Sequence, residues 1–312
     1  TDPIIKERLF GLSGNEGNHG EDVKELYYYL DGSPTHSYMK MLYKYPHQAF
    51  PYDELVKQNS SREKTLGEYE LSDTGVFDEN RYFDIEIEYA KLSTDDLYAR
   101  VSVYNRGPQP ATLHILPQLW FRNTWSWGKD VRNPTILPTS RPILTFENDA
   151  VIARHETLGK RWLYWDGDAD PVFCENETNT RRLFNQHKAG LTKDGINDFI
   201  VHGKKNAVDR KSGTKAALDF NLVIQSGESA TIRIRLCDMQ QITPIKNFDD
   251  LFAKRITETD AFYNELQSDI EDADSRLVQR QALAGMLWTK QFYYFDVPEW
   301  IKGDMGQPEP PE

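Results

Sequence analysis

Apolar and polar residues alternate along most of the first three quarters of the chain. In residues 81–92 (RYFDIEIEYAKL), Phe83, Ile85 and Ile87 share one face, and acidic side chains occupy the positions between them. A period of two is typical of a strand that is buried on one side and exposed on the other. This segment is therefore predicted to be a strand of an antiparallel sheet.

Two longer segments repeat this alternation on both sides of a turn. Residues 97–121 alternate around the sequence NRGPQP, in which Gly107 and Pro108 favour a bend. Residues 216–238 alternate in the same way around the tripeptide SGE. Strands at this spacing, joined by turns rich in Gly, Pro and Asn, predict a mainly β fold, with a large antiparallel β-sandwich over residues 1–245.

The hydrophobic period changes to that of a helix in the last quarter of the chain. Residues 246–274 place apolar side chains at helical spacing and are predicted to form a helical linker. Ser275 to Phe295 are apolar on almost every side, which is typical of a helix buried among other helices. Because the chain supplies no such partners, we expect residues 275–312 to begin a helical domain that continues beyond Glu312.

The overall composition limits the functional classes. The 312 residues carry 37 Lys and Arg against 49 Asp and Glu, a net charge of −12, so we expect no nucleic-acid partner. No apolar run is long enough to span a bilayer, so we expect no membrane partner. Cys174 and Cys237 lack the spacing of metal ligands, and we expect reduced core thiols, no metal and no cofactor. We expect a cytoplasmic protein. Because the sequence begins without Met, we also expect that its native N-terminus is missing.

A loop near the N-terminus is dense in polar side chains. Between Gly14 and Asp22 it carries the candidate pocket-wall or substrate-binding residues Glu16, Asn18, His19 and Glu21. Their spacing matches no zinc or calcium pattern. Two carboxylates could divide acid and base roles, and amide, imidazole and carboxylate groups suit the hydroxyls of a sugar. Ordinary turn chemistry explains the same residues, so the alternatives stay open.

A second dense segment is rich in tryptophan. Between residues 116 and 130, the candidate substrate-binding or pocket-wall residues are Trp120, Arg122, Asn123, Trp125 and Trp127. Large amphipathic rings anchor cores and domain interfaces, which is the interpretation we favour. The same rings could form a flat platform for a sugar, and the two roles are compatible.

Four long segments resemble one known family. They are KERLFGLSGNEGNHGEDVKELYYYLDGSPTHSYMKMLYKYP (residues 6–46), FDENRYFDIEIEYAK (77–91), NRGPQPATLHILPQLWFRNTWSWG (105–128) and QRQALAGMLWTKQFYYFDVPEWIKGD (279–304). The chain resembles the N-terminal region of bacterial proteins of glycoside hydrolase family 63, which are similar to mannosyl-oligosaccharide glucosidase.

That resemblance implies both an architecture and an activity. It implies a β-sandwich (supersandwich) that leads through a helical linker into an (α/α)6 barrel, so residues 275–312 would hold the first barrel helix. It also implies hydrolysis of α-glucosidic bonds with inversion, by an acid and a base carboxylate. Those carboxylates are expected in the barrel beyond Glu312, so no catalytic residue is assigned to this chain. The expected partners are a carbohydrate and the C-terminal barrel of the same protein.

Two other functional classes remain as alternatives. One is a non-catalytic carbohydrate-binding or structural module. The other is a lyase or epimerase that acts on the sandwich itself, for which His114, Arg122 and His155 are the candidate residues. The exact sugar, its linkage and the oligomeric state do not follow from the sequence.

Overall fold

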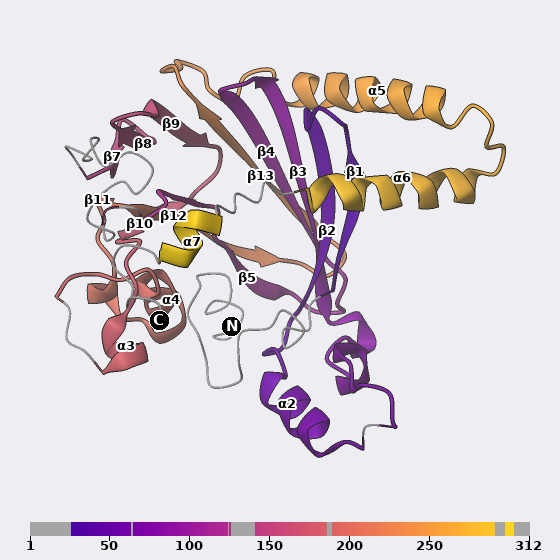
Figure 1. Cartoon of the computed structure of the whole chain (residues 1–312), viewed down its shortest axis with the longest axis horizontal. Helices are drawn as coiled ribbons and strands as arrows, with labels where there is room; N and C mark the ends of the chain where they lie inside the picture. Colours follow the sequence, from indigo (N-terminus) through magenta and orange to yellow (C-terminus); the bar gives the residue numbers. More distant parts are fainter. Residues whose placement is uncertain are drawn as a thin grey trace.

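Strands dominate the structure. The computed structural model describes residues 26–63, 65–123, 125, 141–185, 189–290 and 297–302. Within these residues the two long helices, α5 (Phe248–Leu266) and α6 (Ala273–Trp288), follow the last strand (Figure 1). The prediction of a mainly β fold with a large antiparallel sheet is therefore confirmed.

The larger of the two sheets has nine strands, all paired antiparallel, in the order β1-β2-β3-β4-β13-β9-β8-β7-β11. The longest ladders join neighbouring strands near its centre, where β3 pairs with β2 and with β4. The strands are β1 (Leu26–Gly32), β2 (Tyr38–Pro46), β3 (Tyr82–Ser93), β4 (Asp96–Asn105), β7 (Ile143–Glu147), β8 (Ala150–His155), β9 (Gly159–Trp165), β11 (Ser212–Gly213) and β13 (Ser229–Cys237).

The smaller sheet is built around one long strand, β12 (Lys215–Ile224). Its first half pairs with β10 (Asp170–Cys174) on one edge and with β6 (Gln118–Trp120) on the other. Its second half pairs with β5 (Ala111–Ile115). Strands β5 and β6 therefore follow one another along the same side of β12.

The main hydrophobic core lies between the two sheets. The larger sheet contributes residues such as Phe83 and Val103, and the smaller sheet contributes Leu218 and Phe220. Each of these four side chains is at most 1% exposed. Burial of one such side chain stabilises a fold by roughly 1.5–3 kcal/mol relative to leaving it in water. The two sheets therefore form one cooperative body.

Shorter helices connect the strands. The segments between β2 and β3 and between β10 and β12 supply most of them. They are α2 (Tyr52–Ser61), η2 (Leu71–Thr74), η3 (Asp78–Asn80), α3 (Thr180–Phe184), α4 (Gly195–His202) and η5 (Lys205–Ala207), and α7 (Val297–Lys302) lies near the C-terminus. Among these, α4 packs against β10 through Ile196, which is 1% exposed.

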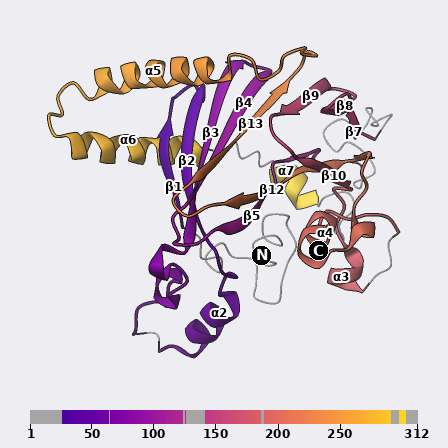
Figure 2. The ribbon, with the colours of Figure 1, turned by 180° about the vertical axis from the view of Figure 1, so that it is seen from behind.

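Helices α5 and α6 form a hairpin beside β1, on the side of the large sheet away from α3 and α4 (Figure 2). Helix α5 packs Phe248 and Phe252 against Tyr38 and Tyr98 of the sheet. The hydroxyl of Tyr263 donates a hydrogen bond of 2.7 Å to the carbonyl oxygen of Gly32. These contacts fix the hairpin on the first strands of the sheet.

Helix α6 contacts β1 at its C-terminal half. Its Arg280 pairs with Asp31 of β1 and with Asp260 of α5. The indole of Trp288 donates to the carbonyl oxygen of Asp31 at 2.9 Å and stacks on Tyr29, with ring centroids 5.3 Å apart. Gly32 lies close to Ala284 and Leu287 of α6, at ordinary van der Waals distance for an added methyl group.

Candidate functional site

A cavity of about 930 Å³ opens between the large sheet, strands β5 and β6, and helix α4. That volume lies within the range of about 300–1,000 Å³ that is usual for small-molecule sites. The polar and aromatic side chains that line the cavity are Tyr27, Tyr29, Tyr43, Tyr45, His47, Phe83, Tyr89, Thr112, His114, Gln118, Asn197 and Trp288; aliphatic residues and prolines form the rest.

Tyrosines of the first three strands form one wall of this cavity. Alternation along β1 and β2 brings Tyr27 and Tyr29 to the same side of the sheet as Tyr43 and Tyr45. The rings of Tyr27 and Tyr29 are 5.6 Å apart, and those of Tyr43 and Tyr45 are 6.0 Å apart. Burial raises the pKa of Tyr29, so its hydroxyl stays protonated at neutral pH. The wall offers flat apolar faces together with neutral hydroxyl groups.

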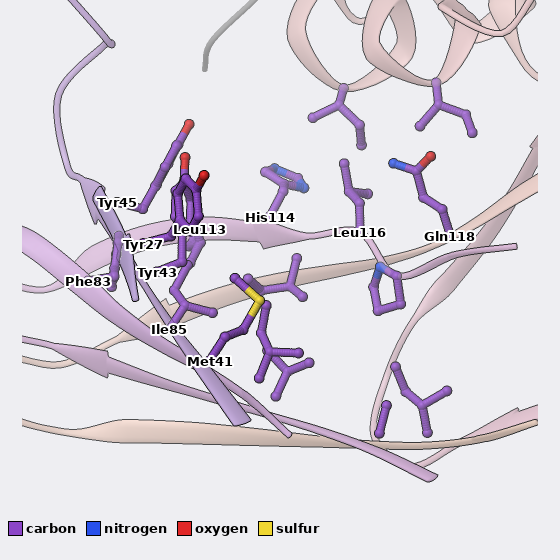
Figure 3. Close-up of a pocket in the computed structure, with 18 of the residues that line it drawn as sticks. Tyr27, Met41, Tyr43, Tyr45, Phe83, Ile85, Leu113, His114, Leu116 and Gln118 are labelled. Atoms are coloured by element: carbon purple, nitrogen blue, oxygen red, sulfur yellow. The ribbon is translucent and has the colours of Figure 1, made fainter. Parts of the chain in front are cut away.

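His114 lies beside this tyrosine wall, on β5. Its Nδ1 is 2.7 Å from Oδ1 of Asp219 on β12. A neutral imidazole that donates from Nδ1 keeps Nε2 as an acceptor. Figure 3 shows His114, Leu116 and Gln118 pointing together toward the helices, with the hydroxyl ends of Tyr27, Tyr43 and Tyr45 on the same side.

Three polar atoms in the described part of the chain are buried without a hydrogen-bond partner: Nε2 of His47, Oε1 of Gln118 and Nδ2 of Asn197. All three belong to residues that line the cavity. Burial lowers the pKa of His47, which favours its neutral form. Buried polar atoms are usually paired, so three exceptions around one cavity point to a polar ligand or ordered water as their partner.

The first residues of the tryptophan-rich segment, 116–119, line this cavity, whereas the candidate residues Trp120, Arg122, Asn123 and Trp125 are not part of the described lining. Asn123 donates through Nδ2 to the carbonyl oxygen of Asn176 at 2.9 Å. Trp125 donates through Nε1 to Glu177 at 2.6 Å, and the guanidinium of Arg141 lies 5.1 Å from the Trp125 ring. These contacts tie the segment to the loop after β10.

Among the described residues of this segment, Trp120 and Arg122 are exposed. The Trp120 side chain is 52% exposed at the end of β6, and Nζ of Lys215 lies 6.0 Å from its ring. Arg122 is also exposed. A sugar platform at Trp120 remains a prediction. Glu16, Asn18, His19, Glu21 and Trp127 lie outside the described residues.

The three residues considered for a lyase or epimerase do not line one site together. His114 lines the cavity, whereas His155 and Arg122 do not. The ring of His155 packs against Phe121 at 5.4 Å, and its Nδ1 accepts from the backbone of Thr157.

The described residues contain no group of three or more His, Cys, Asp or Glu side chains that could hold a metal ion. None of the helices described here is long and apolar enough to cross a membrane. Both cysteines are buried free thiols, and burial raises the pKa of Cys174 to about 12.

Sequence comparison identifies one long relative. The uncharacterized protein YMR196W of Saccharomyces cerevisiae is 37% identical over 362 residues, which cover 99% of this chain and 32% of the yeast protein. The chain therefore spans about a third of the length of the curated relative that it matches. No protein-family model matches the chain.

Structure comparison finds proteins named for chemistry on carbohydrates. A protein named as a kojibiose phosphorylase from human microbiome has 9% identity and a TM-score of 0.28, over 65% of this chain and 21% of that chain. The polysaccharide lyase BACCELL_00875 has 15% identity and a TM-score of 0.32, over 67% and 22%. A protein named as an aldose 1-epimerase from Escherichia coli K12 has 10% identity and a TM-score of 0.27, over 67% of each chain. At such TM-scores these similarities carry no argument about activity.

Sequence reasoning found part of this site. The tyrosine-rich strands and His114 stand out by composition, although nothing in the sequence places them together. Gln118 and Asn197 carry no motif signal, and they approach the same cavity only because β6 and α4 fold against one end of the sandwich.

Proposed function

We propose that this chain is the sandwich domain of a longer carbohydrate-active protein, an inverting α-glucosidase of the family 63 type. In this proposal, a helical catalytic domain follows residue 312 and packs against α6. The observation that carries the proposal is the uncovered apolar surface of α6. Its Leu277, Val278 and Met286 are 51%, 59% and 70% exposed.

The spacing of these residues supports a docking surface. Val278, Ala282 and Met286 are four residues apart, so they lie along one stripe of the helix. The buried side of α6 is a different one, centred on Ala284, which is fully buried. A helix with apolar residues on both its covered and its uncovered sides is suited to a position between two layers. The length of the yeast relative, about three times that of the match, is consistent with a further domain.

The proposed catalytic domain would supply both carboxylates. Inversion requires them to lie roughly 6.5–9.5 Å apart, so that a water molecule fits beside the sugar. The sandwich would contribute a wall of the pocket through Glu16, Asn18, His19 and Glu21. These residues directly precede β1, whose Tyr27 lines the cavity. Trp120, Arg122, Asn123, Trp125 and Trp127 are the second proposed wall.

The catalytic part of the proposal is tested on the longer protein, assayed with a panel of α-glucosides and α-mannosides. His19→Ala and Glu21→Ala are expected to slow turnover of glucosides while leaving the melting temperature nearly unchanged. Variants that melt early but turn over normally when folded would contradict the pocket-wall role. Activity on none of the glucosides would overturn the assignment to glucosidases.

The docking part is tested with a charge on the uncovered stripe of α6. Met286→Lys is expected to lower the melting temperature of the longer protein and to have little effect on the 312-residue chain. Met239→Lys is the matched control, because Met239 is 66% exposed and lies in the loop after β13. Equal effects of the two substitutions on the longer protein would refute the docking surface.

The second candidate function is a non-catalytic carbohydrate-binding module. The tyrosine wall favours it, because the C–H faces of sugar rings pack on aromatic rings. Saccharide binding by the 312-residue chain, without hydrolysis by the longer protein, would favour this alternative over the first.

A further inference from the structure

The cavity beside the tyrosine wall has an unusual electrostatic property in so acidic a protein. Among the described residues, none of the side chains that line it belongs to Lys, Arg, Asp or Glu. Asp219, whose carboxylate holds the imidazole of His114, is a charged neighbour of a lining residue. A phosphate, carboxylate or ammonium ligand would find no counter-ion in the lining. The described part of the lining therefore favours a neutral ligand.

The lining has two chemically different ends. His114 of β5 and Gln118 of β6 point the same way, toward the helices (Figure 3), and Asn197 of α4 belongs to the same lining. From there the cavity continues along the inner face of β3 and β4, where Ile87 and Leu97 belong to the lining. The six-residue separation of Phe83 and Tyr89 along β3 corresponds to a length of about 20 Å. A ligand that fills this space needs a polar head and an extended apolar body.

The polar end also has hydrogen-bonding capacity that the chain does not use. Oε1 of Gln118 and Nδ2 of Asn197 are buried without partners in the described structure. One is an acceptor and the other is a donor, and a hydroxyl group can serve both. A ligand with neighbouring hydroxyls would satisfy these atoms together with Nε2 of His114. The two amides must turn toward the ligand for this, because both atoms are buried although the residues themselves are partly exposed.

We infer that this cavity binds a neutral glycoside with an apolar aglycone. The sugar ring lies between His114, Gln118 and Asn197, with the tyrosine wall beside it. The alkyl or aryl aglycone lies along the inner face of β3 and β4. Only the choice of a sugar as the polar head rests on the proposed function; the neutrality and the two-ended shape follow from the lining.

Calorimetric titration of the 312-residue chain tests this inference. The ligands are octyl glucoside below its critical micelle concentration, glucose as the head alone, and 1-octanol as the tail alone. We expect octyl glucoside to bind at least tenfold more tightly than either fragment. Gln118→Leu and Asn197→Leu are expected to weaken octyl glucoside binding at least fivefold and to leave octanol binding unchanged.

Two control variants keep the test interpretable. Gln58→Leu makes the same chemical change on the exposed surface of α2, and it should leave every affinity unchanged. Ala99→Phe adds volume inside the cavity and should abolish binding of both octyl glucoside and octanol, while circular dichroism verifies that the variant is folded.

Several outcomes would overturn the inference. They are the absence of octyl glucoside binding, octanol binding as tightly as the glucoside, and glucoside affinity that is insensitive to Gln118→Leu and Asn197→Leu. Because the titration requires no hydrolysis and no further domain, its failure is distinguishable from failure of the proposed glucosidase function. An inactive longer protein that still binds octyl glucoside in this cavity would leave the inference intact.

Discussion

Lys215 provides a direct test of the packing described above. This first residue of β12 is 1% exposed, and its Nζ donates to the carbonyl oxygen of Lys193 at 3.2 Å. Burial lowers the pKa of Lys215 to about 8 from its ordinary value of 10.5, against the opposing influence of Cys174 and Asp194. Removal of the ammonium from water disfavours the charged form more than these neighbours favour it.

The sign of the effect on stability follows from the two pKa values. Below about pH 8 both the folded and the unfolded chain hold the proton, so the cost of the buried charge is fully present. Between about pH 8 and 10.5 the folded chain has released a proton that the unfolded chain retains, so the free energy of unfolding rises with pH. The total rise from this one group is about 3 kcal/mol, an upper bound, since each pKa unit corresponds to about 1.4 kcal/mol.

Lys215→Met removes this titration and keeps most of the volume of the side chain. We expect the variant to be more stable by about 1–3 kcal/mol at pH 7, because the buried charge is removed. The gain stays below the upper bound because the hydrogen bond to Lys193 is lost as well. Urea unfolding of both proteins from pH 7 to pH 10.5 measures the difference between their stabilities. That difference should shrink as the pH rises. Lys57→Met, on the exposed side of α2, is the control, and a difference that is independent of pH would refute the buried position of the ammonium.

Two further substitutions test the fold. Asp96→Ala leaves the buried guanidinium of Arg235 without its bidentate partner at 2.7 and 2.9 Å, so we expect a loss of about 3–5 kcal/mol in the free energy of chemical unfolding. A loss of less than about 1 kcal/mol in the free energy of unfolding would contradict the buried position of this ion pair. Gly195→Ala puts a methyl group 2.2 Å from the carbonyl oxygen of Ala207, and we expect a loss of about 1–3 kcal/mol, measured by thermal unfolding. Gly67→Ala, with nothing within 4 Å, should be nearly neutral, and equal effects at the two glycines would contradict the close approach.

The sequence predicted the strands well, because alternation is a local property. The strand predicted over residues 81–92 agrees with β3 (Tyr82–Ser93), and the predicted turn at Gly227 has the positive φ of 75° that favours glycine. The pairing of β12 with both β5 and β6 is not local. It joins residues about 100 positions apart, and no period in either segment encodes it.

Helix α6 shows where an apolar pattern predicts too much. Its composition indicates burial on every side, and the structure buries mainly the side toward β1, where Ala284 is 0% exposed, while Met286 is 70% exposed. Under the proposed function, the apolar residues on the exposed side would be covered by the further domain. The cavity was harder to predict, because its polar residues belong to no recognisable sequence pattern. Gln118 and Asn197 are ordinary polar residues, and their significance arises only from buried atoms without partners.

The helix that carries the candidate docking surface also contributes a residue to the cavity, and this joins the two proposals physically. Trp288 ends α6, and it also lines the cavity, where it stacks on Tyr29. Its ring lies 6.1 Å from that of Tyr89, on a third strand, and its indole is held by the backbone of Asp31. The domain proposed to cover α6 would therefore act on the cavity through this hydrogen-bonded ring. Aglycone binding and domain docking should then be coupled through Trp288, so that Met286→Lys changes octyl glucoside affinity in the longer protein but not in the 312-residue chain.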